Sequence, residues 1–141
     1  MTGTVVLPPP IPPAWLKLLA VVAGLFGLLT IVSGGKVLFG PPEARLAAGN
    51  YVPFVLWFNF LAGFFYVGAA VAIWRGASVA FPMSALLAAA TLAVFVLFIL
   101  HVMSGAPHEV RTLGAMILRS GFWVGVTAAL WWWKGRGQAE S

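Results

Sequence analysis

Cysteine is absent from the chain, and acidic residues are scarce, with only three among 141 residues. The missing cysteines exclude disulfides, thiolate metal sites and thiol redox chemistry. Charged residues of both signs make up just 8% of the chain, far below their share in soluble domains. The sequence also lacks a glycine-rich phosphate loop and a serine or threonine in a recognisable base-paired pattern, so nucleophilic catalysis has no support.

The chain is instead rich in apolar side chains. Hydrophobic residues account for 62% of it and the mean hydropathy is +1.01, which is typical of a small integral membrane protein. A formal net charge of +5 would suggest nucleic acid as the partner of a soluble protein. Here the basic residues mostly flank apolar runs, a pattern that indicates membrane topology and lipid-headgroup contacts. We therefore expect membrane lipids, and no nucleic acid, around the protein.

Four apolar runs are long enough to cross a bilayer as helices. They predict an all-α integral membrane protein, an antiparallel four-helix bundle that forms one domain over residues 14–134. The expected spans are residues 14–34, 53–74, 79–102 and 107–133. A proline-rich tail of residues 1–13 precedes the bundle, and a solvated C-terminal tail of residues 135–141 follows it. The first tail has no basic n-region, so we expect no cleaved signal peptide.

Local signals set the expected helix ends. Pro41 and Pro42 exclude a continuous helix through the longest connection, residues 35–52. Asn50 and Ser78 are good N-cap residues and are expected to cap the second and third spans. Pro107 is expected at the first position of the fourth helix, where a missing N–H costs nothing.

The basic residues around the spans predict the orientation of the bundle. One side carries four of them and the other side carries three. The positive-inside tendency then places both termini in the cytoplasm, with the protein as a multi-pass component of a bacterial inner membrane. The first set is Lys17, Arg75, Lys134 and Arg136, and the second is Lys36, Arg45 and Arg111.

Arg119 lies inside the fourth apolar run, roughly 12 Å beyond Arg111 at the helical rise per residue. A charge at that depth costs several kcal/mol unless it snorkels, pairs or faces protein. We expect its guanidinium to face the bundle or a partner. Its acceptors are expected to be Glu109, Glu43, Asn59, helix-end carbonyls or a bound polar headgroup.

A polar stripe leads to this arginine along the fourth helix. His108, Thr112, Ala115 and Arg119 follow one another at i, i+4, i+7 and i+11, and therefore share one face. Trp123 comes four residues later and is placed to stack on the guanidinium.

The second span carries a polar face of its own, with Asn59, Gly63 and Tyr66 at i, i+4 and i+7. One interpretation is helix packing across the glycine, with Arg119 paired structurally. The other is a pocket that binds a ligand or partner, in which a quinone or lipid would present polar acceptors on an apolar body. The residues of that pocket would be Arg119, Asn59, Tyr66, Thr112 and Trp123.

A third polar group lies where the third and fourth spans meet. His101, Met103, His108 and Glu109 are candidate metal ligands, and the mixture of imidazole and thioether would suit copper, or else zinc. Their spacing matches no diagnostic ligand motif. The alternative is that both histidines are plain interfacial residues.

The end of the first span, IVSGGKVLFGPP, and the histidine that closes the third span resemble the DoxX-like family of small bacterial membrane proteins. The positions that carry the resemblance are Ser33, Gly34, Lys36, Gly40 and His101. Such proteins often have a glutamate in the second span, where this chain has Asn59. Some members are described as small subunits of quinol-oxidising complexes, so the resemblance implies a respiratory or redox setting.

These observations lead to one functional hypothesis and one alternative. The first is a small accessory or structural subunit of a bacterial membrane redox complex, quinone-linked and without catalytic activity of its own. Its partners would be other membrane subunits or further copies of the chain. The alternative is a metal-handling or small-solute membrane protein that uses the histidine, methionine and glutamate cluster.

Overall fold

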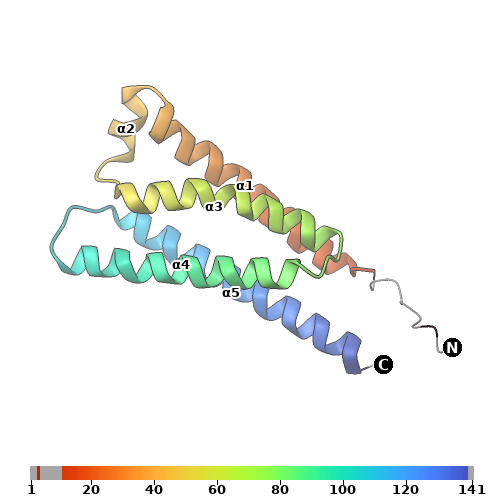
Figure 1. Ribbon diagram of the computed structural model, residues 1–141. Helices are drawn as coiled ribbons and strands as arrows, with labels where there is room; N and C mark the ends of the chain where they lie inside the picture. Colours follow the sequence, from red (N-terminus) through yellow and green to blue (C-terminus); the bar gives the residue numbers. More distant parts are fainter. Residues whose placement is uncertain (1–2, 4–10, 140–141) are drawn as a thin grey trace.

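The computed structural model describes residue 3 and residues 11–139, and it consists of helices and their connections (Figure 1). Most of the predicted tail, residues 1–2 and 4–10, and the last two residues, 140–141, lie outside the described part. The helices are α1 (Ala14–Phe39), α2 (Pro42–Ala48), α3 (Pro53–Trp74), α4 (Ala80–Met103) and α5 (Val110–Ala139).

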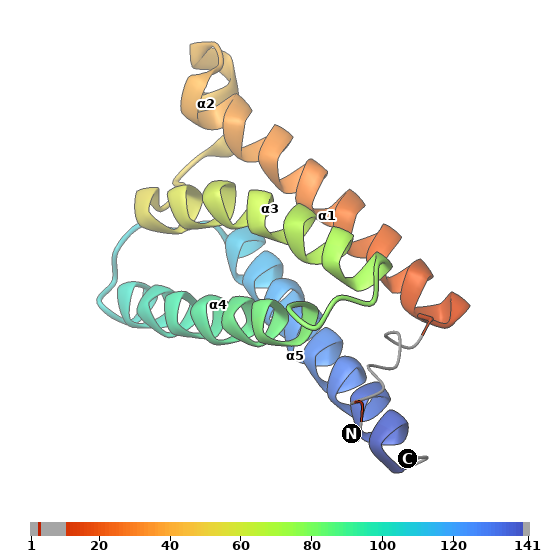
Figure 2. The same ribbon diagram turned by 45° about the vertical axis from the view of Figure 1, so that its right-hand side comes forward.

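Of the helices in this described part, four are long and apolar enough to cross a membrane: α1, α3, α4 and α5. The predicted fold class, an all-α protein with four membrane helices, is therefore confirmed, and the protein is a multi-pass membrane protein by the length and composition of its helices. The helices α1 and α3 pack tightly, α4 packs on α5, and α3 joins the two pairs (Figures 1 and 2).

The break at the double proline is confirmed, but α1 and α5 both end later than predicted and α5 also begins later. The first helix continues past residue 34 to Phe39, and a separate short helix, α2, then begins at Pro42. The last helix begins at Val110 rather than Pro107 and continues past Trp133 to Ala139. The predicted C-terminal tail is thus helical over its described residues up to Ala139.

The two predicted N-caps are wrong. The N-cap of α3 is Val52 and that of α4 is Val79, and neither makes a side-chain capping hydrogen bond. Pro53 opens α3 and has no N–H that needs an acceptor. The amide of Ala80 instead bonds the carbonyl of Ala77 at 3.1 Å, so a backbone turn replaces the side-chain cap.

Glycines allow the close approach of α1 and α3. A Cβ at Gly27 would lie 2.9 Å from the carbonyl oxygen of Gly63, and a Cβ at Gly63 would lie 2.8 Å from Ile31. Real Cβ atoms do not approach backbone oxygens so closely, so a side chain at Gly27 would push the helices apart. The two helices therefore pack at Gly27 and Gly63 as closely as their backbones allow.

An aromatic cluster fills the middle of the bundle. Tyr66 and Trp123 are fully buried and their ring centroids are 4.9 Å apart. Phe26 of α1 contacts Tyr66 at 5.5 Å and Phe122 of α5 at 5.3 Å between centroids. These rings connect α1 to α5 through side chains, although α1 packs its backbone against α3.

The start of α1 and the end of α5 lie at the same end of the bundle (Figure 1). Trp15 contacts Trp132 there, with 6.1 Å between ring centroids. Lys17 lies 5.0 Å from the ring of Trp74 at the end of α3. Tryptophans interleaved with basic side chains are typical of a membrane interface. The short helix α2 and the α4–α5 connection lie at the opposite end (Figure 2).

Candidate functional site

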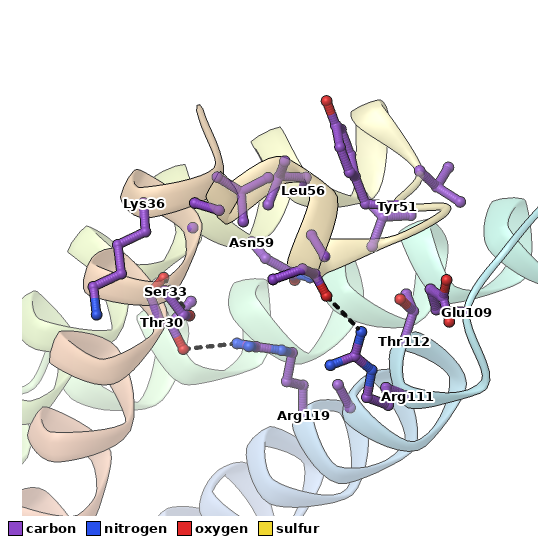
Figure 3. A pocket seen from close by; sticks show the side chains of 18 residues that line it. Thr30, Ser33, Lys36, Tyr51, Leu56, Asn59, Glu109, Arg111, Thr112 and Arg119 are labelled. Atoms are coloured by element: carbon purple, nitrogen blue, oxygen red, sulfur yellow. Dashed lines mark hydrogen bonds between the residues drawn. The ribbon is translucent and has the colours of Figure 1, made fainter. Parts of the chain in front are cut away.

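A cleft of about 500 Å³ lies between α1, α2, α3 and the first turns of α5, at the end of the bundle away from the helix termini just described (Figure 3). Eight of its eighteen lining residues are alanine, valine or leucine. Polar side chains enter it from three of the helices. They are Thr30, Ser33 and Lys36 of α1, Asn59 of α3, and Arg111, Thr112 and Arg119 of α5, with Glu109 just before α5.

Arg119 forms the floor of this cleft and reaches from α5 to α1. Its Nη1 donates a hydrogen bond to the hydroxyl of Thr30 at 2.8 Å (Figure 3). Its guanidinium carbon lies 5.0 Å from the centroid of the Phe26 ring. The hydroxyl of Thr30 in turn donates to the carbonyl of Phe26 at 2.7 Å. Because that proton is committed to the backbone, the hydroxyl oxygen is free to accept from the guanidinium.

The guanidinium therefore faces the bundle, as the sequence predicts, but its acceptor within the chain is none of the predicted protein groups. The bonded acceptor is Thr30, on a helix 89 positions earlier in the chain, rather than Glu109, Glu43 or Asn59. Thr30 is the first hydroxyl residue in the first span, after sixteen residues without one. That hydroxyl, the deepest in the span, was the available signal, since polar residues inside membrane helices tend to bond across helices.

Seven side-chain polar atoms of the described residues are buried without a hydrogen-bond partner, and two of them belong to residues that line the cleft. One is the Nε donor of Arg119 and the other is the Oδ1 acceptor of Asn59. The amide nitrogen of Asn59 bonds only the sulfur of Met116, at 3.7 Å, and a thioether is a weak acceptor. Buried polar atoms are nearly always paired, so an unpaired donor and an unpaired acceptor beside one cleft indicate a place for a polar ligand or water.

The predicted polar stripe on the last helix is confirmed in part. Thr112, Ala115 and Arg119 all line the cleft. His108 does not, because it precedes the helix; its Nδ1 lies 3.1 Å from the carbonyl of Ala106 and its ring packs on Phe98. The helix begins after Glu109, whose carbonyl accepts from the amide of Thr112.

Two of the predicted pocket residues belong to the core instead. Tyr66 and Trp123 are fully buried against each other and do not line the cleft. The predicted stacking of Trp123 on Arg119 is wrong, since the aromatic neighbour of Arg119 is Phe26. Trp123 lies four residues along α5, but its side chain points to α3 rather than to α1.

A pair of charged residues before and in the first turn of α5 ties α2 over the cleft. Glu109 accepts a hydrogen bond from the amide of Asn50 at 2.8 Å, and Arg111 donates to the carbonyl of Ala47 at 3.2 Å. Gly49 lies between them with φ +69°, and a Cβ there would collide with the Glu109 carboxylate. Only glycine takes this conformation at no steric cost and leaves room for the carboxylate. We call these two contacts the α2 latch.

Arg45 fixes the other side of α2. Its Nε and Nη2 donate to the carbonyls of Val37 and Leu38 at 3.2 and 3.3 Å, in the last turn of α1. These carbonyls lack partners within the helix, so a cation satisfies both their hydrogen-bonding capacity and the negative end of the helix dipole. The short helix α2 is thus held between α1 and α5, above the cleft.

The predicted metal ligands are not brought together in the described residues. His101 lies with Nε2 3.2 Å from the carbonyl of Pro107, His108 packs on Phe98, and Glu109 belongs to the α2 latch. Met103 is 76% exposed. The described part of the chain contains no group of three or more histidine or acidic side chains placed to hold a metal ion.

Comparisons with protein-family models, with curated proteins and with solved structures found no match. The resemblance to the DoxX-like family therefore stays a prediction.

Proposed function

We propose that the protein is a membrane binding protein that holds one amphiphilic molecule in the cleft above Arg119. The observation that carries this proposal is the state of the guanidinium: Nη1 is bonded to Thr30, whereas Nε is buried at the cleft without a partner. A donor in that state gains a hydrogen bond when an acceptor enters. Asn59, which lines the same cleft, has an unpaired buried acceptor.

The walls of the cleft support an amphiphile over a fully polar solute. Val37, Val55 and Leu56 line it together with several alanines. Apolar surface combined with a small number of placed polar groups is the usual form of a site that orients a ligand with a polar head and an apolar body. The site offers hydrogen-bonding groups rather than a nucleophile beside a base, so we assign it binding and no catalysis.

We propose a bacterial inner membrane as the setting, with both termini in the cytoplasm and the cleft near the outer side. The sequence further predicts an accessory subunit of a quinone-linked redox complex. A quinone would offer carbonyl acceptors to Arg119 and a ring to the apolar walls, and a lipid headgroup would offer oxygen acceptors to the same donor.

Extraction of the purified protein tests the binding proposal. Protein prepared in mild detergent would be extracted with organic solvent, and bound amphiphiles quantified by mass spectrometry. We expect a near-stoichiometric amphiphile with the parent protein and its loss in Arg119→Leu. Leucine removes the charge without leaving Thr30 unpaired, since Thr30 still donates to the Phe26 carbonyl.

The matched control is Arg75→Leu, because Arg75 is an exposed arginine at the end of α3, opposite the cleft. It should retain the amphiphile at the parent level. Equal amphiphile content in Arg119→Leu and Arg75→Leu would contradict the proposal. Purification from the native membrane tests the setting: co-purified haem or large subunits would support a redox complex, and a lone chain would count against it.

A further inference from the structure

Charge is distributed unevenly around the cleft. Among the described residues that line it, three are cationic, Lys36, Arg111 and Arg119, and one is acidic, Glu109. The Glu109 carboxylate accepts from the Asn50 amide in the α2 latch. Arg119 itself is bonded to a neutral hydroxyl and not to a carboxylate. The cleft is therefore a positively charged site with no acidic group at its floor.

The charges lie at two depths. Arg119 and Thr30 form the floor, while Arg111 lies eight residues earlier on α5 and Lys36 six residues later on α1. At the helical rise these separations correspond to roughly 12 Å and roughly 9 Å along the helices. Arg111 and Arg119 both project from α5 into the cleft (Figure 3). A ligand that enters from this end of the bundle passes Arg111 on α5 before it reaches Arg119.

The positive charge of Arg119 distinguishes a neutral ligand headgroup from an anionic one. A neutral carbonyl would satisfy the Nε donor of Arg119 but would leave the positive charge of the floor uncompensated in a medium of low dielectric. An anion would satisfy both. Several equivalent oxygens on one centre also suit the planar donor fork of a guanidinium, which matches phosphate and carboxylate geometry.

On these grounds, and resting on the proposed function, we propose that the cleft is a phosphate site that binds the anionic headgroup of a membrane phospholipid. The headgroup phosphate accepts hydrogen bonds from Arg119. Arg111 lies nearer the mouth, Lys36 adds positive charge from α1, and the apolar part of the lipid packs against Val37 and Leu56. Free inorganic phosphate offers the same oxygens but gains nothing from the apolar walls.

Native mass spectrometry of the full-length protein in a neutral detergent tests this inference. The probes are phosphatidylglycerol, phosphatidylcholine with the same acyl chains, a short-chain quinone, and inorganic phosphate alone. We expect phosphatidylglycerol to bind most tightly. Arg119→Gln should weaken it roughly ten- to hundredfold, as expected for the loss of hydrogen bonds to a charged donor.

Further variants separate a loss of binding at Arg119 from a general effect of charge or folding. Arg75→Gln removes the same charge at the far end and should leave binding unchanged. Arg119→Lys keeps the charge but loses the donor fork, so its affinity should fall between those of the parent and Arg119→Gln. Arg111→Gln should give a smaller loss, because Arg111 lies at the mouth. Unchanged thermal midpoints would verify that each variant is folded.

The outcomes separate the two proposals. Tight, Arg119-dependent binding of inorganic phosphate would support the phosphate chemistry and overturn the lipid as its source. Arg119-dependent binding of the quinone, with no preference for phosphatidylglycerol, would overturn the phosphate site and leave the proposed function standing. Binding of none of the probes in an Arg119-dependent way would overturn both.

Discussion

Arg119 and Thr30 join two helices whose backbones do not pack against each other. The 2.8 Å bond from Nη1 to Oγ1 spans the gap between α5 and α1 at the floor of the cleft. Beyond it, Phe26 and Phe122 make the next contact between the same helices, at 5.3 Å between ring centroids. The cleft therefore ends at this hydrogen bond, and aromatic packing fills the space between the two helices beyond it.

Replacement of Thr30 by valine should destabilise the bundle by about 1–3 kcal/mol, because a partly buried guanidinium loses its acceptor. Thermal unfolding in detergent would measure the change as a lower midpoint. Thr127→Val is the matched control: Thr127 is half-buried and donates to the carbonyl of Trp123 at 2.8 Å, as Thr30 does to Phe26. It should cost clearly less.

A double-mutant cycle isolates the Arg119 contribution. In an Arg119→Leu background the cost of Thr30→Val should fall to that of Thr127→Val, because no charge is left without an acceptor. An unchanged cost in that background would show that Thr30 acts independently of the arginine.

The tight packing of α1 on α3 predicts that a glycine-to-alanine substitution lowers the stability at Gly27 but not at Gly121. Gly27→Ala places a Cβ 2.9 Å from the Gly63 carbonyl oxygen, and we expect it to cost about 1–3 kcal/mol through the forced separation of the helices. Gly121→Ala is the control, because a Cβ at Gly121 meets nothing within 4 Å. It should be neutral or slightly stabilising, since alanine restricts the unfolded chain. Similar midpoints for the two variants would contradict the packing argument.

Much of this architecture follows from local patterns, and the rest depends on contacts between distant residues. Apolar run lengths predict four spans, and Pro41–Pro42 predict the break between α1 and α2. Helical spacing places Thr112 and Ala115 on the face of Arg119, as observed. Each of these features can be predicted from the residues close to it in the sequence.

The partner of Arg119 and the helix α2 could not be derived in the same way. Thr30 lies 89 positions from Arg119, and no periodicity within one helix tells which residue of another helix faces it. The seven residues of α2 are too few to carry a periodic signal or to form an isolated helix. The helix is held by Arg45 and Arg111, which donate to carbonyls of α1 and of α2 itself.

The α2 latch predicts local rather than global opening. Glu109→Ala removes a charge-assisted hydrogen bond, worth about 1.5–3 kcal/mol, and should speed amide exchange at Asn50 at least tenfold. Hydrogen–deuterium exchange in nanodiscs would detect this as faster labelling over residues 44–50, with no change in α4. Glu43→Ala removes an exposed carboxylate from the first turn of α2 and serves as the control. If the two variants exchange alike, Glu109 does not hold the loop.

The last prediction concerns which side of the membrane the cleft faces. The basic residues favour the end that carries the termini as the cytoplasmic end only by four to three, so direct labelling is needed. Because the chain has no cysteine, single replacements give an unambiguous readout with a membrane-impermeant maleimide. Glu43 and Ser78 are exposed and belong to opposite ends of the bundle, on α2 and in the α3–α4 turn (Figure 1). In spheroplasts Glu43→Cys should be labelled directly, whereas Ser78→Cys should react only after the membrane is permeabilised. The reverse pattern would place the termini outside and open the Arg119 cleft towards the cytoplasmic leaflet, from which its ligand would then have to come.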